Sequence, residues 1–286
     1  MATTGIEVGA ASTTHAGWVD PDAAIAYALA TDDPRELYLR GEAVHPLFTV
    51  ALVHGSMGEA TRRGIAGGAV RGATGAVHAQ HDVHLLGDVA PGMAVRWRAE
   101  TYGARQTSAG ALVTQRIEVC DERGVPLVVH YWSSLHTGGT IESDVGPDLP
   151  DHTFPPAARD RPLGRRLLDV TVDQSFRYAG ASGDRNPHCV DDQAARREGF
   201  PGKILQGLCT FALCSGGVLD VGTGGDPRTL TRIAGRFSAP VFPRAVLAVE
   251  VFDAGVDEQG GRVLAFEATS GGRTVVKHGR AHFRPA

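Results

Sequence analysis

The sequence lacks several features that would place it in a specialised class. Its four cysteines form no CxxC pair and have no zinc-ligand spacing, which argues against a metal site and favours free thiols. The first residues have neither the basic nor the apolar region of a signal peptide, and no apolar run reaches the roughly 18 residues of a membrane helix. We therefore expect a cytoplasmic protein, in a reducing compartment, that does not enter a membrane.

Charged residues form no long run of one sign. The 28 Lys and Arg against 32 Asp and Glu give a net charge of −4, and no basic patch indicates a nucleic-acid partner. Hydrophobic residues make up 42% of the chain, which is enough for a normal core, and 286 residues are sufficient for two domains of about 140 each. The composition therefore predicts a two-domain globular protein.

One segment separates the two predicted domains. Residues 138–162 are rich in Gly, Pro and Asp and have no apolar periodicity, as is typical of a linker. We therefore expect an N-terminal domain over 10–137 and a C-terminal domain over 163–286.

The two predicted domains repeat each other. Residues 27–33 (YALATDD) match 178–184 (YAGASGD) in residue type at an offset of 151, and residues 89–100 match 241–252 at an offset of 152. A pattern of strand, glycine-containing turn and strand then follows in both halves. Three matches in one order, at nearly one offset, indicate a duplicated fold.

Each half combines one helix with a set of strands. The apolar runs 47–64 and 204–221 predict one helix per half, and alternating strand patterns follow each run. One helix followed by an antiparallel meander, twice over, predicts an α+β fold in which each sheet wraps around an apolar helix. In the second half we expect strands over 232–243, 245–256, 262–271 and 273–283.

The densest cluster of chemically active residues lies in the second half. Residues 178–210 read YAGASGDRNPHCVDDQAARREGFPGKILQGLCT. This segment resembles the signature of the MaoC-like hydratases, the (R)-specific enoyl-thioester hydratases of hotdog fold. Their pattern runs roughly Y-x-x-x-S-G-D-x-N-P-I-H-x-D and, later, P-I-x-H-G-L-C-T. In the first half, residues 77–92 are similar to a strand of the two-hotdog members of that family.

The resemblance implies a double hotdog fold with catalysis in the second half. The substrate would be an acyl thioester on coenzyme A or an acyl carrier protein, in fatty-acid or polyketide metabolism. The enzyme would add or remove water at a 2-enoyl or 3-hydroxyacyl group. The first half would be non-catalytic and would shape the acyl pocket. The resemblance implies no cofactor and no metal, and a homodimer is one assembly that it allows.

Hydration of an enoyl thioester sets clear chemical requirements. A carboxylate and a second polar group must hold one water, and a backbone N–H must point at the thioester oxygen. Asp184 fits the carboxylate. Gly207, at the opening of the predicted helix, fits the N–H donor because a helix N-terminus favours negative charge. We expect Ser182 and Gly183 to form the turn that aims Asp184, and Asn186 to orient its neighbours.

The segment departs from the family pattern at both histidines. Cys189 stands five residues after Asp184, where the family has its second catalytic residue, and Gln206 replaces the histidine before the helix glycine. The nearest imidazole is His188, one position early. In an extended segment, a shift of one residue turns a side chain to the opposite face. His188 would then reach Asp184 only if a local bulge re-aimed it.

Three hypotheses remain open. In the first, a bulge pairs His188 with Asp184 and the protein is a working hydratase or dehydratase. In the second, Asp184 works with Cys189, Gln206 or a substrate group in another reaction, such as dehydration with one acid–base residue, isomerisation or cyclisation. In the third, the site is inactive and the protein only binds acyl chains. A nucleophilic Cys189 belongs to the second hypothesis, but without a dedicated base an inert thiol is favoured. We expect an active site that has been altered.

The first half carries other candidates. His78, His81 and His84 lie on a predicted strand, where His78 and His84 would share a face and His81 would not, so we prefer strand or surface histidines to a metal site. Asp32 and Asp33 occupy the first-half image of the catalytic aspartate, but no Asn-Pro pair or histidine follows as in the family pattern. We therefore predict no catalysis in this half.

Overall fold

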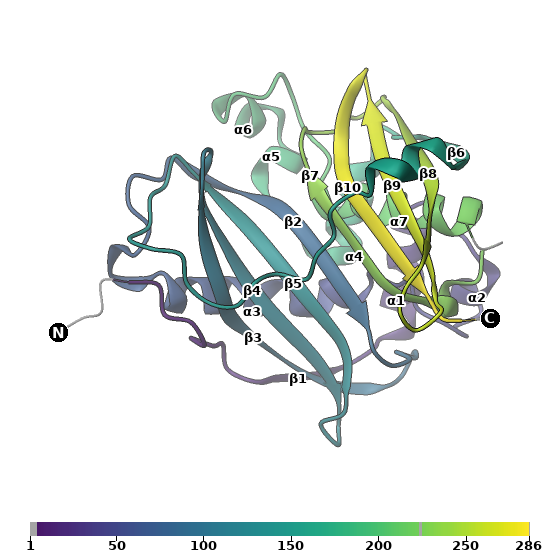
Figure 1. The fold of residues 1–286 in the computed structure, drawn as a ribbon, viewed down its shortest axis with the longest axis horizontal. Helices are drawn as coiled ribbons and strands as arrows, with labels where there is room; N and C mark the ends of the chain where they lie inside the picture. The colour runs from purple at the N-terminus through teal and green to yellow at the C-terminus, as the bar shows by residue number, and fades with distance from the viewer. Residues whose placement is uncertain (1–4, 223–224, 286) are drawn as a thin grey trace. The chain divides into compact units, whose positions relative to one another are not determined.

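Each half of the chain places a helix of 16 residues ahead of four antiparallel strands (Figure 1). The computed structural model describes residues 5–222 and 225–285. The two helices are α3 (Thr49–Gly64) and α7 (Gly207–Gly222), where the apolar runs predict them. The strands of the first half are β1 (His15–Trp18), β2 (Gly75–Leu85), β3 (Ala94–Thr107), β4 (Gly110–Asp121) and β5 (Pro126–Thr137). Those of the second half are β6 (Pro162–Asp169), β7 (Leu230–Phe237), β8 (Val246–Val256), β9 (Arg262–Ser270) and β10 (Arg273–Phe283).

Shorter helices surround the strands. The α-helices are α1 (Pro21–Ala30), α2 (Glu36–Leu39), α4 (Gln174–Ser182), α5 (Pro187–Val190) and α6 (Asp192–Arg197). Single 3₁₀ turns are η1 (Ala66–Gly68), η2 (Pro156–Asp160) and η3 (Pro227–Thr229). Among the described residues, no helix is both long and apolar enough to cross a membrane.

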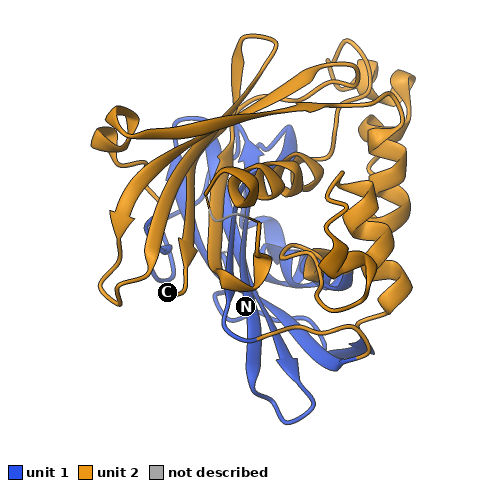
Figure 2. Cartoon of the chain, turned by 90° about the vertical axis from the view of Figure 1, so that its right-hand side faces the viewer, with its two compact units in different colours: residues 1–18, 52–87, 93–151 blue, residues 19–51, 88–92, 152–286 orange. Residues whose placement is uncertain are grey.

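The chain divides into two compact units, which Figure 2 shows in different colours. Unit 1 comprises residues 1–18, 52–87 and 93–151. Unit 2 comprises residues 19–51, 88–92 and 152–286, so that α1 and α2 from the first half of the sequence belong to the same unit as the whole second half.

The strand order is the same in both units. It is β1-β3-β4-β5-β2 in unit 1 and β6-β8-β9-β10-β7 in unit 2, and neighbouring strands within each unit are antiparallel. Corresponding strands thus take corresponding positions, as a duplicated fold requires. Strand β7 ends at Phe237, six residues before the predicted end, because Pro240 and Pro243 lack the N–H that a ladder needs.

Helix α7 is the centre of the core of unit 2. It packs against β6, β7, β8 and β9, and every residue from Leu208 to Ser215 is buried. A helix that is apolar all round is stable only when it is covered on every side. Helix α3 in unit 1 is less apolar and ends in exposed Arg62 and Arg63.

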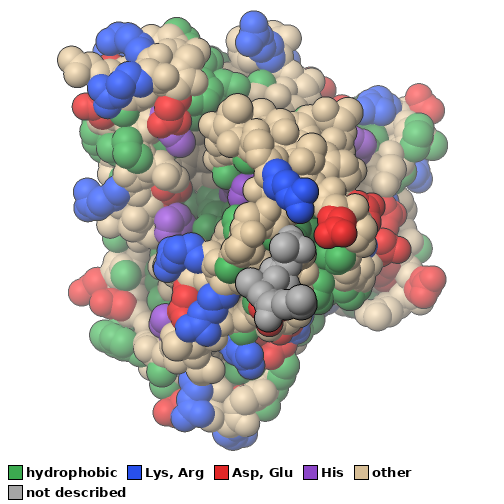
Figure 3. All heavy atoms as spheres, turned by 90° about the vertical axis from the view of Figure 1, so that its left-hand side faces the viewer, with side chains coloured by type: hydrophobic (Ala, Val, Ile, Leu, Met, Phe, Trp, Pro, Cys, Tyr) green, Lys and Arg blue, Asp and Glu red, His purple; other side chains and the backbone are tan. Residues whose placement is uncertain are grey.

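On the molecular face drawn in Figure 3, basic and acidic side chains alternate and do not gather into one patch of a single sign.

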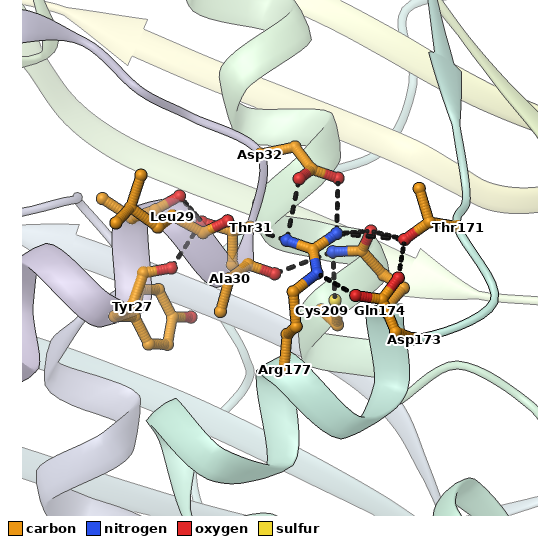
Figure 4. A network of polar contacts seen from close by, with 11 residues as sticks. Tyr27, Leu29, Ala30, Thr31, Asp32, Thr171, Asp173, Gln174, Arg177 and Cys209 are labelled. Carbon is orange, nitrogen blue, oxygen red and sulfur yellow. Dashed lines mark hydrogen bonds and ion pairs between the residues drawn. The ribbon is translucent and has the colours of Figure 1, made fainter.

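Helices α1 and α4 of unit 2 contact each other through equivalent residues. The hydroxyls of Tyr27 and Tyr178 lie 3.4 Å apart, and these residues are separated by 151 positions, the offset of the sequence repeat. A contact between a residue and its own image is the mark of a two-fold relation. Gln174 Nε2 donates to the Ala30 carbonyl at 2.7 Å, and the Arg177 guanidinium pairs with Asp32 at 2.9 Å (Figure 4).

Candidate active site

The turn expected at Ser182 and Gly183 is present at the end of α4. Gly183 has a φ of 77°, the left-handed conformation in which a glycine ends a helix without steric cost. Ser182 Oγ donates to the Tyr178 carbonyl at 2.7 Å and accepts the Asp184 N–H at 3.2 Å. The serine hydroxyl therefore joins the last helical turn to the backbone that carries Asp184.

One oxygen of the Asp184 carboxylate is held by Asn186. Oδ1 accepts the backbone N–H of Asn186 at 3.2 Å and its side-chain Nδ2–H at 2.8 Å. Oδ2 takes no hydrogen bond from any described residue, although Asp184 is only 7% exposed. The carboxylate is thus fixed through one oxygen, while the other makes no hydrogen bond to a described residue.

The segment after Asn186 is helical, which corrects the expectation of an extended chain. Residues Pro187–Val190 form α5, and Pro187 occupies a first-turn position, where the fixed φ of proline suits a helix. In a helix, a shift of one residue rotates a side chain by about 100°, not to the opposite face. The structure has no bulge here that would aim His188 at Asp184.

His188 is paired elsewhere. Its Nδ1 lies 2.8 Å from Glu198 Oε2, and its ring contacts Phe200. Within the described part of the chain, no hydrogen bond or ion pair joins His188 to Asp184. The geometry therefore gives no support to the first hypothesis, in which these two residues form the acid–base pair.

Cys189 occupies the position beside Asp184 but is a poor nucleophile. It is 1% exposed, and burial raises the pKa of its thiol, with the charges of Asp184 and Glu198 acting in the same direction. The thiolate, not the thiol, attacks an acyl carbon. The geometry therefore argues against acyl transfer through Cys189. All four cysteines are free, as the sequence predicts.

Gln206 connects the beginning of α4 to the Asp184 backbone. Its Nε2 donates to the Ser175 carbonyl at 3.0 Å and to the Asp184 carbonyl at 3.1 Å. The opposite amide orientation would place an oxygen against two carbonyl oxygens, so these contacts fix which atom is which. Gln206 Oε1 is buried and has no hydrogen-bond partner.

Gly207 begins α7, as predicted. Its backbone N–H has no hydrogen-bond acceptor among the described residues, as expected for the first turn of a helix. A Cβ at this position would lie 3.7 Å from the Phe237 ring, which is ordinary contact. Gly207 therefore presents an unpaired N–H next to Gln206, whose side chain reaches the Asp184 backbone.

Tyr178 is a site neighbour that the sequence analysis did not single out. It is fully buried, and its pKa is raised well above the usual value by burial first and then by Tyr27, Cys209 and Asp184. The phenol therefore stays protonated. The repeated tyrosine that opens both matching segments was the available signal, because a residue kept in both copies has a common structural environment.

The histidines of β2 correct a second expectation. A register shift between His78 and Gln80 places His78 and His81 together, with His81 Nδ1 3.3 Å from His78 Nε2. His81 Nε2 is also 3.1 Å from His130 Nδ1, and His81 is fully buried. The strict alternation of faces was wrong because a bulge breaks it. Burial lowers the pKa of His78 and of His130 to about 3, so both are neutral. Among the described residues, no group of three or more potential ligands is placed to hold a metal ion.

Comparisons with known proteins find a matching domain, similar sequences and similar structures. Residues 154–272 match the family model described as MaoC like domain. This match lies in the second half of the chain and covers less than half of its length. The chain is 26% identical over 178 residues to a probable enoyl-CoA hydratase 2 of Dictyostelium discoideum, which covers 62% of this chain and 60% of that protein. It spans 60% or less of the length of the curated relatives that it matches.

Solved structures that resemble this chain show its fold along nearly its whole length. A MaoC-like dehydratase from Phytophthora capsici superposes with a TM-score of 0.82 at 21% identity and 97% coverage of both chains. A Mycobacterium tuberculosis protein described as having a double hotdog fold superposes with a TM-score of 0.62 at 13% identity, over 99% of this chain and 98% of that one. The fold is the predicted α+β double hotdog, in which each sheet has its own central helix.

Within the segment that matches the MaoC like domain, both positions that hold histidine in the family pattern are occupied by buried residues that make other contacts. Gln206 hydrogen-bonds two backbone carbonyls, and Cys189 packs as an apolar side chain. The structure therefore brings together Asp184, Asn186 and Gln206, with Gly207 adjacent, and directs His188 toward Glu198.

Proposed function

We propose that the chain adds or removes water at a 2-enoyl or 3-hydroxyacyl group of an acyl thioester, with Asp184 as its single acid–base residue. The observation that carries this proposal is the Asp184 carboxylate, which is buried, fixed through Oδ1 and open at Oδ2. The match of residues 154–272 to the MaoC like domain, and a relative named as a probable enoyl-CoA hydratase, support the same reaction class.

The proposed hydration needs two proton transfers. Asp184 Oδ2 takes a proton from the water as the water oxygen bonds to C3, and the same carboxyl group then delivers a proton to C2. Negative charge develops on the thioester oxygen between these events. The Gly207 N–H donates to that oxygen, and the dipole of α7 adds to the stabilisation. Dehydration follows the same steps in reverse.

We propose that Gln206 takes over the role of the histidine that the family pattern has at this position. Buried polar atoms are almost always hydrogen-bonded, and Gln206 Oε1 is a buried acceptor without a protein partner. A water that donates one hydrogen to this oxygen and the other to Asp184 Oδ2 presents its lone pairs to the substrate. Gln206 thus acts as a positioning residue. Ser182 and Asn186 hold Asp184 in place.

We propose coenzyme A or an acyl carrier protein as the carrier, and a first half that contributes to the acyl pocket without catalysis. A polyketide-type acyl chain and a homodimer also stay predictions. A second candidate function has its own support, because the absence of both family histidines fits a domain that binds an acyl thioester without turnover. Another reaction on such a chain, cyclisation or isomerisation, would use the same carboxylate.

An assay of crotonyl-coenzyme A hydration, followed by loss of enoyl absorbance, separates these functions. We expect wild-type turnover, and Asp184→Asn should lower kcat/KM on the order of 10²-fold or more because the amide cannot accept the proton. The matched control is Asp192→Asn, which alters an exposed aspartate paired with Lys203 in the same region.

Each result decides between the candidates. Full activity of Asp184→Asn would remove Asp184 from the mechanism. If the wild type binds crotonyl-coenzyme A but leaves the enoyl absorbance unchanged, hydration of this substrate is excluded and the binding function is favoured. Product analysis by mass spectrometry then distinguishes binding from isomerisation, because isomerisation changes retention without changing mass.

A further inference from the structure

A second carboxylate and imidazole lie together in unit 2, at the first-half image of Asp184. Asp33 is 3% exposed, and His45 and Tyr38 are almost fully buried. Each has one buried polar atom without a hydrogen-bond partner: Asp33 Oδ2, His45 Nε2 and Tyr38 Oη. The rings of Tyr38 and His45 are in contact, with centroids 5.7 Å apart. All three residues are thus buried, each carries one unpartnered polar atom, and His45 lies next to both Tyr38 and Asp33.

The hydrogen bonds of His45 define its proton. The Leu47 N–H donates to Nδ1 at 3.1 Å, so the neutral ring carries its hydrogen on Nε2. Burial, with the nearby Arg35 cation, lowers the pKa of His45 to about 3, so the ring is neutral. Nε2 lies 3.8 Å from Asp33 Oδ2, which is too long for a direct hydrogen bond. A donor and an acceptor thus face each other without bonding.

Arg35 already neutralises the other oxygen of Asp33. Its Nη1 forms an ion pair with Asp33 Oδ1, and its Nη2 lies 2.5 Å from Asp220 and 3.2 Å from the Gly216 carbonyl of α7. A second cation would be repelled by the Nε2–H dipole of His45, and an anion would be repelled by the Asp33 carboxylate. The charges therefore select a neutral ligand that can both donate and accept hydrogen bonds.

Gly216 of α7 borders the Asp33 carboxylate. A Cβ at this position would lie 3.4 Å from Asp33 Oδ2 and 3.9 Å from Arg35 Nη1. We propose that Asp33, His45 and Tyr38 enclose one bound water, which accepts from His45 Nε2–H, donates to Asp33 Oδ2 and bonds the Tyr38 hydroxyl. The near-complete burial leaves no route for a substrate, so this is a structural site that fixes the loop after α1 against α7. It does not depend on the proposed function of Asp184.

Tyr38→Phe tests the proposal by the sign of its effect on thermal stability. If the hydroxyl bonds an enclosed water, its removal breaks a hydrogen bond and lowers Tm by about 1–4 °C. If the hydroxyl has no partner, its removal relieves an unsatisfied polar atom and raises Tm, which would overturn the proposal.

Gly216→Ala gives an independent test with a matched control. The alanine is sterically tolerated by the protein atoms, but it would occupy the space of the water and should lower Tm. The control is Gly180→Ala in α4, where a Cβ meets nothing within 4 Å, so Tm should rise through helix propensity alone. A rise in both variants would overturn the proposal. A crystal structure at high resolution should show density within about 2.7–3.2 Å of the three atoms, and a dry cluster there would also refute it.

Discussion

Replacing Gln206 by leucine tests whether this residue stabilises the candidate site. The substitution keeps a side chain of similar size in a position that is 2% exposed, and it removes the two donors that reach the Ser175 and Asp184 carbonyls. Two lost hydrogen bonds cost about 0.5–1.5 kcal/mol each, and a buried carbonyl left unpaired costs about 1–3 kcal/mol. Leucine also removes Oε1, but this atom has no protein partner, so its removal breaks no further hydrogen bond within the protein. We therefore expect a decrease of about 1–3 kcal/mol in the free energy of unfolding.

Urea unfolding followed by circular dichroism measures this difference. The control is Gln259→Leu, which makes the same chemical change on an exposed turn and should stay within about 0.5 kcal/mol of the wild type. A Gln206→Leu protein as stable as the control would contradict the assigned hydrogen bonds. If Gln206 also positions the water, kcat should fall in the folded variant while KM changes little, since the substrate contacts are retained.

Imidazoles and thiols around Asp184 offer three more tests. The double substitution Cys189→His with Gln206→His should increase crotonyl-thioester hydration at least about tenfold, because it restores both imidazoles of the family pattern. A folded double variant without this gain would show that hydration needs other residues that the chain also lacks. His188→Ala should change kcat/KM less than about twofold because His188 pairs with Glu198; a loss on the order of 10²-fold would instead make His188 the acid–base residue. At pH 8, iodoacetamide should modify Cys189 far more slowly in the native protein than after unfolding, because burial raises the pKa of the thiol and thus lowers the thiolate fraction. Mass spectrometry measures both rates of modification, and equal rates would contradict this prediction.

The fold could be predicted because it depends on patterns spread over many residues. Helices α3 and α7 coincide with the two apolar runs, and the strands of the second half follow the alternating segments closely. No single residue decides such a pattern, so errors at the ends, such as the early end of β7, leave the topology unchanged. The repeat at an offset of 151 adds a second constraint that the shared strand order satisfies.

The local geometry of the site was harder to predict because single residues determine it. The segment after Asn186 was expected to be extended, although Pro187 at the first turn of a helix and Asp191 as the N-cap of α6 were readable signals. The bulge between His78 and Gln80 has no comparable signal, since any strand residue can be the one left unpaired. The face of a strand or the side of a helix on which a given side chain lies therefore has to be taken from the structure.

The ion-pair partners of the charged residues could not be predicted from the sequence either. His188 has a carboxylate ten residues later in Glu198, across α6, and nothing in the spacing favours it over Asp184. Nothing in the sequence pairs His45 with Asp33, because His45 lies twelve residues later, far from the spacing of the family pattern. Both pairs form only once short helices fold the chain back on itself. Local spacing is informative within one helix or strand and loses its value across a turn.

The two images of one aspartate explain how a duplicated fold can diverge in its sites while it keeps its scaffold. Asp33 and Asp184 stand at equivalent positions of the repeat, yet Asp33 is neutralised by Arg35 and enclosed, whereas Asp184 has an open oxygen and no cation beside it in the described structure. Removal of one partner from a buried pair of a carboxylate and an arginine leaves an uncompensated charge and is strongly destabilising, so Asp33 and Arg35 depend on each other. Asp184 is held only by the backbone and side-chain N–H of Asn186 at Oδ1, and its Oδ2 has no hydrogen-bond partner among the described residues. The structural role of Asp33 and the proposed catalytic role of Asp184 therefore differ because their partners differ. The sheets and helices that the two halves share stay the same in both cases.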